Sequence, residues 1–197
     1  MRVEYKKWIM NKCLLFLSML AFLTSCQNSQ KSIKTIEGRD ILNSSDYVIW
    51  GESEISWKDF KGHVPSNNKF NAGTYAGISF AKEKNGKMKA FAFFSKHDSW
   101  QNYTSDYGLV HEKYHFTIVE IFARKIRKDL KEQVISFDST NKFNQYVAKV
   151  WTEVEKMQSE YDGETTHSGN QKSQNDWQVK IDREIDRLKE FKNISIE

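Results

Sequence analysis

The chain has 197 residues, of which 39% are hydrophobic and 14% aromatic, so it can build a core and is not a disordered protein. A single proline and nine glycines exclude collagen-like and Pro-rich repeat proteins. The formal net charge of +4 comes mostly from the first 25 residues, because the other 172 carry 26 basic and 25 acidic side chains. This even balance argues against a nucleic-acid-binding protein.

The N-terminal segment has the parts of a bacterial lipoprotein signal peptide. A basic stretch ending at Lys12 precedes an apolar run of about 11 residues, which is short for a membrane span of roughly 20. Leu23-Thr24-Ser25-Cys26 then resembles a lipobox, in which the cysteine is lipidated and becomes N-terminal. We predict a signal peptide over residues 1–25, a lipid on Cys26 and a location in the cell envelope, at the outer membrane if the cell has one. An ordinary signal peptide with an incidental cysteine is the alternative.

A tether is predicted between this anchor and the folded part of the chain. Residues 27–45 are rich in Ser, Asn, Gln and Lys and show little apolar periodicity. The predicted organisation is therefore a lipidated cysteine and flexible tether over residues 26–45, followed by one domain over residues 46–197. Cys26 is the only cysteine beyond the signal peptide, so we expect no disulfide, and stability has to come from the core or a metal.

The predicted elements place strands first and helices after them. Residues 47–50, 74–83 and 88–96 read as strands, and Asn85-Gly86 between the last two favours a type I′ hairpin turn. After Gly108 the apolar period becomes helical, and two further helices are expected, one over about 141–160 and one carrying Trp177. A break is expected over residues 161–170. This order predicts an α+β domain.

The segment His111-Glu112-Lys113-Tyr114-His115 carries the clearest chemical signal. Residues four apart lie one turn above each other on a helix, so both imidazoles can reach one cation, for which Zn²⁺ is the best fit. Glu112 then lies next to the metal, where it can act as general base on a water molecule. Two buried, hydrogen-bonded histidines beside a solvated Glu112 are the alternative explanation.

The third ligand is predicted to be His167, in a polar loop that also brings Asp162 and Glu164 close in sequence. Tyr161 is a candidate for steadying an oxyanion, and Asp162 and Glu164 for supporting the ligands. Glu120 lies about 140° round the helix from His115, so we expect it to form a surface ion pair with Arg124, with at most a supporting role. The other two histidines, His63 and His97, are expected to be ordinary.

These motifs together resemble the bacterial domain of unknown function 922, a family usually described as predicted secreted zinc-dependent proteases. The resemblance implies a zincin-like α+β peptidase fold, with His111 and His115 as ligands and Glu112 as catalytic base. The family commonly has a small residue where this chain has Tyr114, from which we expect altered packing. The segments that carry the resemblance are Trp57 to Gly62, Ser99-Trp100, His111 to Phe116 with Glu120 and Ala123-Arg124, and Tyr161 through His167 and Gln174 to Trp177.

Two functions that use the metal remain open at this point, while a purely structural or adhesive protein without metal would leave the paired histidines unexplained. The first is a lipid-anchored zinc hydrolase, a peptidase whose peptide or protein substrate adds as a strand beside the 74–96 hairpin. The second is a non-catalytic envelope lipoprotein that keeps a structural or vestigial zinc and acts as a binding or assembly module. Glu112 discriminates between them, because a purely structural zinc site has no need of that carboxylate.

Overall fold

The computed structural model describes residues 38–82, 87–136 and 140–192. The predicted signal peptide, Cys26 and the first part of the predicted tether lie outside these residues. The last part of the tether differs from the prediction, because helix α2 (Gly38–Leu42) packs against the sheet with Ile41 only 3% exposed. The described domain therefore begins before residue 46.

A three-stranded antiparallel sheet has the order β1 (Tyr47–Ile49), β4 (Met88–Ser95), β3 (Ala76–Lys82). The register of β3 against β4, from Ala76↔Phe94 to Lys82↔Met88, confirms the predicted hairpin pairing. The predicted Asn85-Gly86 turn lies outside the described residues. A second pair, β2 (Ala72–Gly73) with β5 (Trp100–Gln101), is also antiparallel, and a short 3₁₀ helix, η1 (Trp57–Asp59), follows β1.

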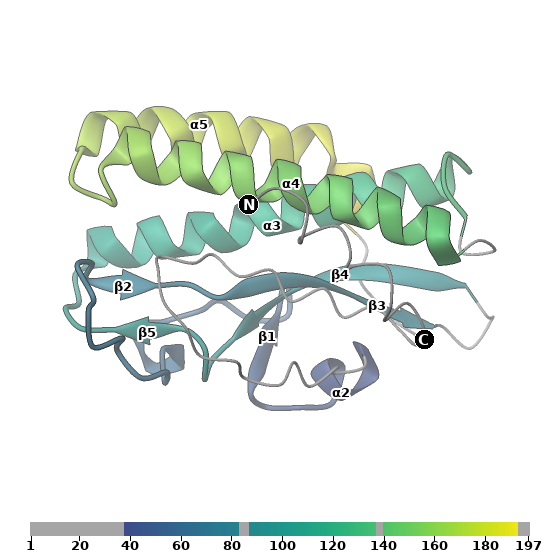
Figure 1. Cartoon of the computed structure of the whole chain (residues 1–197). Coiled ribbons are helices and arrows are strands. Elements are labelled where there is room, and N and C mark those ends of the chain that lie inside the picture. The colour runs from purple at the N-terminus through teal and green to yellow at the C-terminus, as the bar shows by residue number, and fades with distance from the viewer. Residues whose placement is uncertain (1–37, 83–86, 137–139, 193–197) are drawn as a thin grey trace, which may run out of the picture.

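The central strand β4 is buried on both faces, which explains its run of apolar residues. Phe91 and Phe93 pack with Ile41 of α2 on one face, and Ala92 and Phe94 belong to the larger core on the other. Small alanines alternate with large aromatic rings along the strand, so that helices can approach it closely. The sheet is thus covered by α2 on one side and by a helical layer on the other (Figure 1).

Three long helices form that layer: α3 (Asp106–Lys131), α4 (Thr140–Thr165) and α5 (Gln171–Arg187), with a 3₁₀ turn, η2 (Lys189–Phe191), after the last. Figure 1 shows α3 lying between the sheet and the pair formed by α4 and α5. The α+β class with antiparallel strands is confirmed. Within the described part of the chain, none of the helices has the length and apolar character of a membrane-spanning segment.

The predicted break after residue 160 is wrong for its first half, because α4 continues to Thr165. Gly163 costs about 1 kcal/mol in a helix relative to alanine, but Tyr161 and Thr165 are both 0% exposed and hold this turn against the core. The hydroxyl of Thr165 also donates to the carbonyl oxygen of Tyr161 at 2.6 Å. Packing therefore outweighs the glycine, and only residues 166–170 connect α4 to α5.

Glu120 forms the predicted ion pair with Arg124, at 2.9 Å, but the pair is buried rather than on the surface. Arg127 joins it, with its Nη2 at 2.5 Å from the same carboxylate oxygen. Arg127 also donates to the carbonyl oxygens of Ala90 and Phe191. The Glu120 carboxylate is thus the shared counter-charge of two guanidinium groups, of which Arg127 ties α3 to β4 and η2, and Arg124 ties α3 to Ile185 of α5.

Replacing Glu120 with leucine is expected to lower the free energy of unfolding by about 3–5 kcal/mol, because two buried guanidinium groups lose their counter-charge. Urea unfolding followed by circular dichroism measures this. Glu160→Leu is the control, since the exposed pair of Glu160 with Lys156, at 3.8 Å, contributes about 1 kcal/mol or less. Equal stability of the two variants would contradict the structural role of Glu120.

Candidate metal centre

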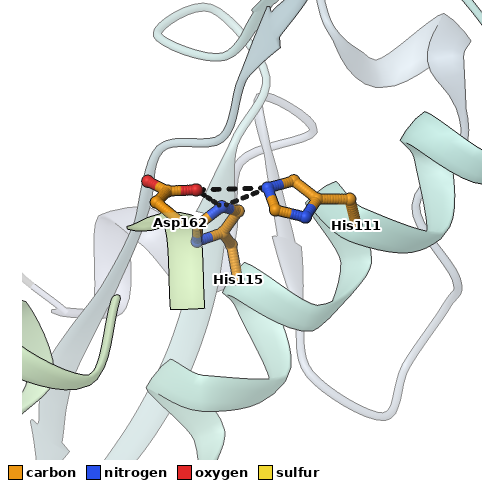
Figure 2. Close-up of side chains that lie close together, drawn as sticks. All are labelled: His111, His115 and Asp162. Atoms are coloured by element: carbon orange, nitrogen blue, oxygen red, sulfur yellow. Dashed lines mark hydrogen bonds and ion pairs between the residues drawn. The ribbon is translucent and has the colours of Figure 1, made fainter. Parts of the chain in front are cut away.

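Helix α3 positions both histidines of the motif. Its N-terminus is fixed by Ser105, whose side chain accepts a hydrogen bond from the backbone N–H of Gly108 at 3.0 Å. His111 is 3% and His115 9% exposed, and their rings converge from successive turns of the helix (Figure 2). Their Nε2 atoms lie 3.1 Å apart. The two imidazoles therefore face one point, as the spacing predicts.

Asp162 of α4 completes this group. Its Oδ1 lies 3.1 Å from Nε2 of His111 and 3.0 Å from Nε2 of His115 (Figure 2). The ligand atoms around a tetrahedral zinc ion are about 3.3 Å apart, given bonds of about 2.0–2.1 Å. Three donors of the types that zinc prefers thus form a triangle of nearly that size, and the residues present fit a divalent metal ion.

Two buried glutamines hydrogen-bond the other nitrogens of the imidazoles. Nδ1 of His111 lies 3.2 Å from Oε1 of Gln174, which is on α5, and Nδ1 of His115 contacts Oε1 of Gln158, which is on α4. Gln158 is 5% and Gln174 0% exposed. The group is therefore built from all three long helices.

The charges of the group are strongly coupled. Burial lowers the pKa of His111. Burial also acts to lower the pKa of His115, but its contact with Asp162 outweighs this and raises the pKa to about 9. Burial acts to raise the pKa of Asp162, but hydrogen bonds with His111 and His115 outweigh it and hold that pKa well below its usual range. The carboxylate is thus ionised, and a cation, whether a proton or a metal ion, is favoured beside it.

Glu112 lies against the same group. Its side chain is buried, at 7% exposure, and its Oε2 has no hydrogen-bond partner among the residues that the structure describes. Its charge acts to raise the pKa of both His111 and His115, so the carboxylate is close to the two rings. A buried carboxylate oxygen without a partner needs a donor or a cation. The alternative of two hydrogen-bonded histidines beside a solvated Glu112 is therefore wrong for Glu112, whose side chain is buried.

His167, the predicted third ligand, lies beside the group rather than within it. Its Nδ1 is 3.3 Å from Oδ1 of Asp162, its side chain is 43% exposed, and its ring lies against that of Phe70, 4.1 Å between centroids. Thr166, His167 and Ser168 all have positive φ angles, of 52°, 47° and 70°. Such backbone is strained for residues other than glycine, so this connection is held by its surroundings.

Tyr161 supports His111 instead of pointing at a reaction site. Its ring stacks on the imidazole of His111, with 4.6 Å between centroids, and its hydroxyl donates to the carbonyl oxygen of the same residue at 3.4 Å. Glu164 accepts a hydrogen bond from the indole of Trp177 at 2.8 Å, which helps to join α4 to α5. The hydroxyl of Tyr114 donates to Asp182 of α5, so this side chain adds a contact between helices.

The other residues considered from the sequence lie outside the group formed by His111, His115 and Asp162. Glu120 is held in its pair with Arg124 and Arg127. His97 is exposed and lies 3.3 Å from Asp46, and His63 is exposed in the loop before β2.

Gln158 and Gln174 were not predicted to belong to the site, although the sequence carries a signal for them. Gln158 follows Val154 by four residues, and Gln174 precedes Trp177 by three. Both glutamines thus interrupt the apolar stripe of an amphipathic helix. A neutral polar residue in such a stripe indicates a buried hydrogen-bond partner, which here is an imidazole.

Residues 94–169 match the family model described as "Bacterial protein of unknown function (DUF922)". This match confirms the resemblance for the segment that contains His111, Glu112, His115, Asp162 and His167. No curated protein matches the chain. No solved structure matches it either.

Proposed function

Because residues 94–169 match the DUF922 family model, we propose that this protein is a lipid-anchored, zinc-dependent hydrolase of the cell envelope, and specifically a peptidase of zincin type. The observation that carries the proposal is the convergence of His111, His115 and Asp162 on one point beside the unpartnered Oε2 of Glu112. His111, His115 and Asp162 would hold the ion, and a bound Zn²⁺ would supply a Lewis acid and lower the pKa of a water molecule to about 7.

Glu112 is the proposed general base. Its carboxylate would take the proton of the attacking water at Oε2 and pass it to the leaving amine. The geometry supports this role, because Oε2 has no hydrogen-bond partner among the described residues and is therefore free to contact a water molecule. A structural zinc site would gain nothing from leaving this oxygen free.

The substrate is proposed to be a peptide or an unfolded protein that approaches from the side of His167. This side chain is the most exposed one in contact with Asp162, and Phe70 beside it is 38% exposed. The peptide is proposed to add as a strand beside the 74–96 hairpin, because β3 is an edge strand of the sheet. Thr74, just before β3, lies next to the site, since its hydroxyl donates to the carbonyl oxygen of Glu112 at 3.4 Å.

A second function is a non-catalytic module with a structural zinc, in which His167 closes the fourth position of the ion. The contact of His167 with Asp162 favours it, since a structural site usually has four protein ligands.

Metal analysis and a hydrolysis assay together decide between the two. A hydrolase is expected to contain about one zinc per chain and to cleave labelled casein, to lose activity with a chelator and to regain it with zinc. Protein that holds zinc but leaves casein and envelope peptides uncut favours the structural site. Protein that holds no zinc when zinc is supplied in excess contradicts both functions.

Zinc affinity is expected to rise with pH. With the pKa of His115 at about 9 in the metal-free protein, zinc has to displace the proton of that imidazole at lower pH, and Asp162 is already ionised. The apparent association constant should therefore rise about tenfold per pH unit below pH 9. Competition with a chromophoric chelator at pH 6, 7 and 8 measures it. An affinity that stays constant from pH 6 to 8 would contradict the proton held between His115 and Asp162.

A further inference from the structure

We propose that Gln158 and Gln174 are positioning residues of the metal centre: their amide oxygens keep the proton of each imidazole on Nδ1, so that both Nε2 lone pairs face Asp162. This inference rests on the proposed zinc site and adds residues that the motif alone does not reveal.

The orientation of the Gln158 amide is fixed by the backbone of α3. Its Nε2 donates to the carbonyl oxygen of His115 at 3.0 Å, which an amide oxygen could not do. The oxygen of the same amide must then face the ring, where it contacts Nδ1 of His115. Since an amide oxygen only accepts, Nδ1 has to carry the hydrogen and Nε2 is left for a cation.

Gln174, which lies on α5, makes the corresponding pair of hydrogen bonds with His111 and the backbone of α3. Its Nε2 donates to the carbonyl oxygen of Tyr107 at 3.3 Å, and its Oε1 lies 3.2 Å from Nδ1 of His111. The side chain is 0% exposed, so water cannot replace these hydrogen bonds. Each ligand imidazole is thus oriented by one amide, whose nitrogen donates to a backbone carbonyl oxygen of α3 and whose oxygen contacts Nδ1 of the ring.

The choice of amides also limits the charge of the site. Metal-binding histidines are often hydrogen-bonded by carboxylates, which make the ligands more basic. Here the acceptors are neutral, and the negative charge near the rings belongs to Asp162 and Glu112. A carboxylate in place of the Gln158 amide would keep the acceptor for Nδ1 and add charge, but its second oxygen would lie against the carbonyl oxygen of His115, to which the amide donates.

Zinc binding of four variants tests the inference. Gln158→Met and Gln174→Met are expected to bind zinc about 10–100-fold more weakly than the wild type. Gln158→Glu keeps the acceptor for Nδ1 but loses the donor to the carbonyl oxygen of His115, so it should bind zinc more tightly than Gln158→Met and no more tightly than the wild type. Gln171→Met, at an exposed position of α5, is the control and should bind unchanged. Chelator competition at one pH gives the affinities, and circular dichroism shows that each variant is folded.

A second measurement does not depend on any variant being folded. In the zinc-loaded wild type, ¹⁵N spectra of the imidazoles should show His111 and His115 protonated on Nδ1 and bound through Nε2. Zinc bound through Nδ1 would overturn the inference, as would Met variants that bind zinc like the wild type. A wild type that binds no zinc would remove the proposed function as well, whereas intact zinc binding in the Met variants would leave that function standing.

Discussion

Glu112→Gln is expected to keep its zinc and to lose hydrolytic activity by about 10²–10⁴-fold in kcat, the usual contribution of a general base. Glutamine has the size of glutamate, so packing around this buried position is preserved, but an amide cannot take up a proton from water. His111, His115 and Asp162 remain in place in this variant. Initial rates on a fluorogenic peptide and the zinc content of the same preparation measure the two effects separately.

Glu153→Gln is the matched control, because Glu153 is exposed on α4. It carries the same change of charge, and both its zinc content and its rate should equal those of the wild type. A Glu112→Gln variant that cleaves as fast as the wild type would remove Glu112 as the base. Loss of zinc from Glu112→Gln would instead assign its carboxylate to metal binding.

Asp162→Ala is expected to weaken zinc binding by about 10²–10³-fold. Structural zinc sites bind with about 10–16 kcal/mol, or roughly 2.5–4 kcal/mol for each of four ligands, and Asp162 supplies one of the three converging atoms. His167→Ala should weaken binding by only a few-fold, because His167 touches Asp162 from the exposed side. Chelator competition at pH 8 compares the two variants.

The comparison also tests the original prediction of His167 as the third ligand. If His167→Ala loses more zinc affinity than Asp162→Ala, then His167 binds the ion and Asp162 orients the His167 ring. Asp186→Ala is a control for the loss of an aspartate, since Asp186 is exposed on α5.

The parts of the fold that were predictable are those whose signal is local. The helical period after Gly108 is carried by residues that all face one way, and the hairpin by two apolar runs around one turn sequence. The pair of histidines was predictable for the same reason, because a spacing of four on one helix determines that both rings share a face. No knowledge of the rest of the chain is needed for either.

Where the structure differs from the predictions, the cause is tertiary packing. Gly163 suggested a loop, yet the burial of Tyr161 and Thr165 keeps α4 helical and so brings Asp162 to the histidines. Glu120 suggested a surface pair, yet contacts between α3, β4 and η2 enclose it. A polar composition likewise suggested a tether over residues 26–45, but Ile41 and Leu42 near its end pack against the sheet. Each of these three features depends on contacts with residues that are distant in the sequence.

Helix α2 has a consequence for how the domain can be handled. Composition places the start of the domain at residue 46. A chain that begins there lacks α2, so the aromatic rings of Phe91 and Phe93 become exposed on one face of the sheet. Apolar patches of this kind promote self-association. A fragment that keeps this sheet face covered therefore has to start upstream of Gly38, where α2 begins.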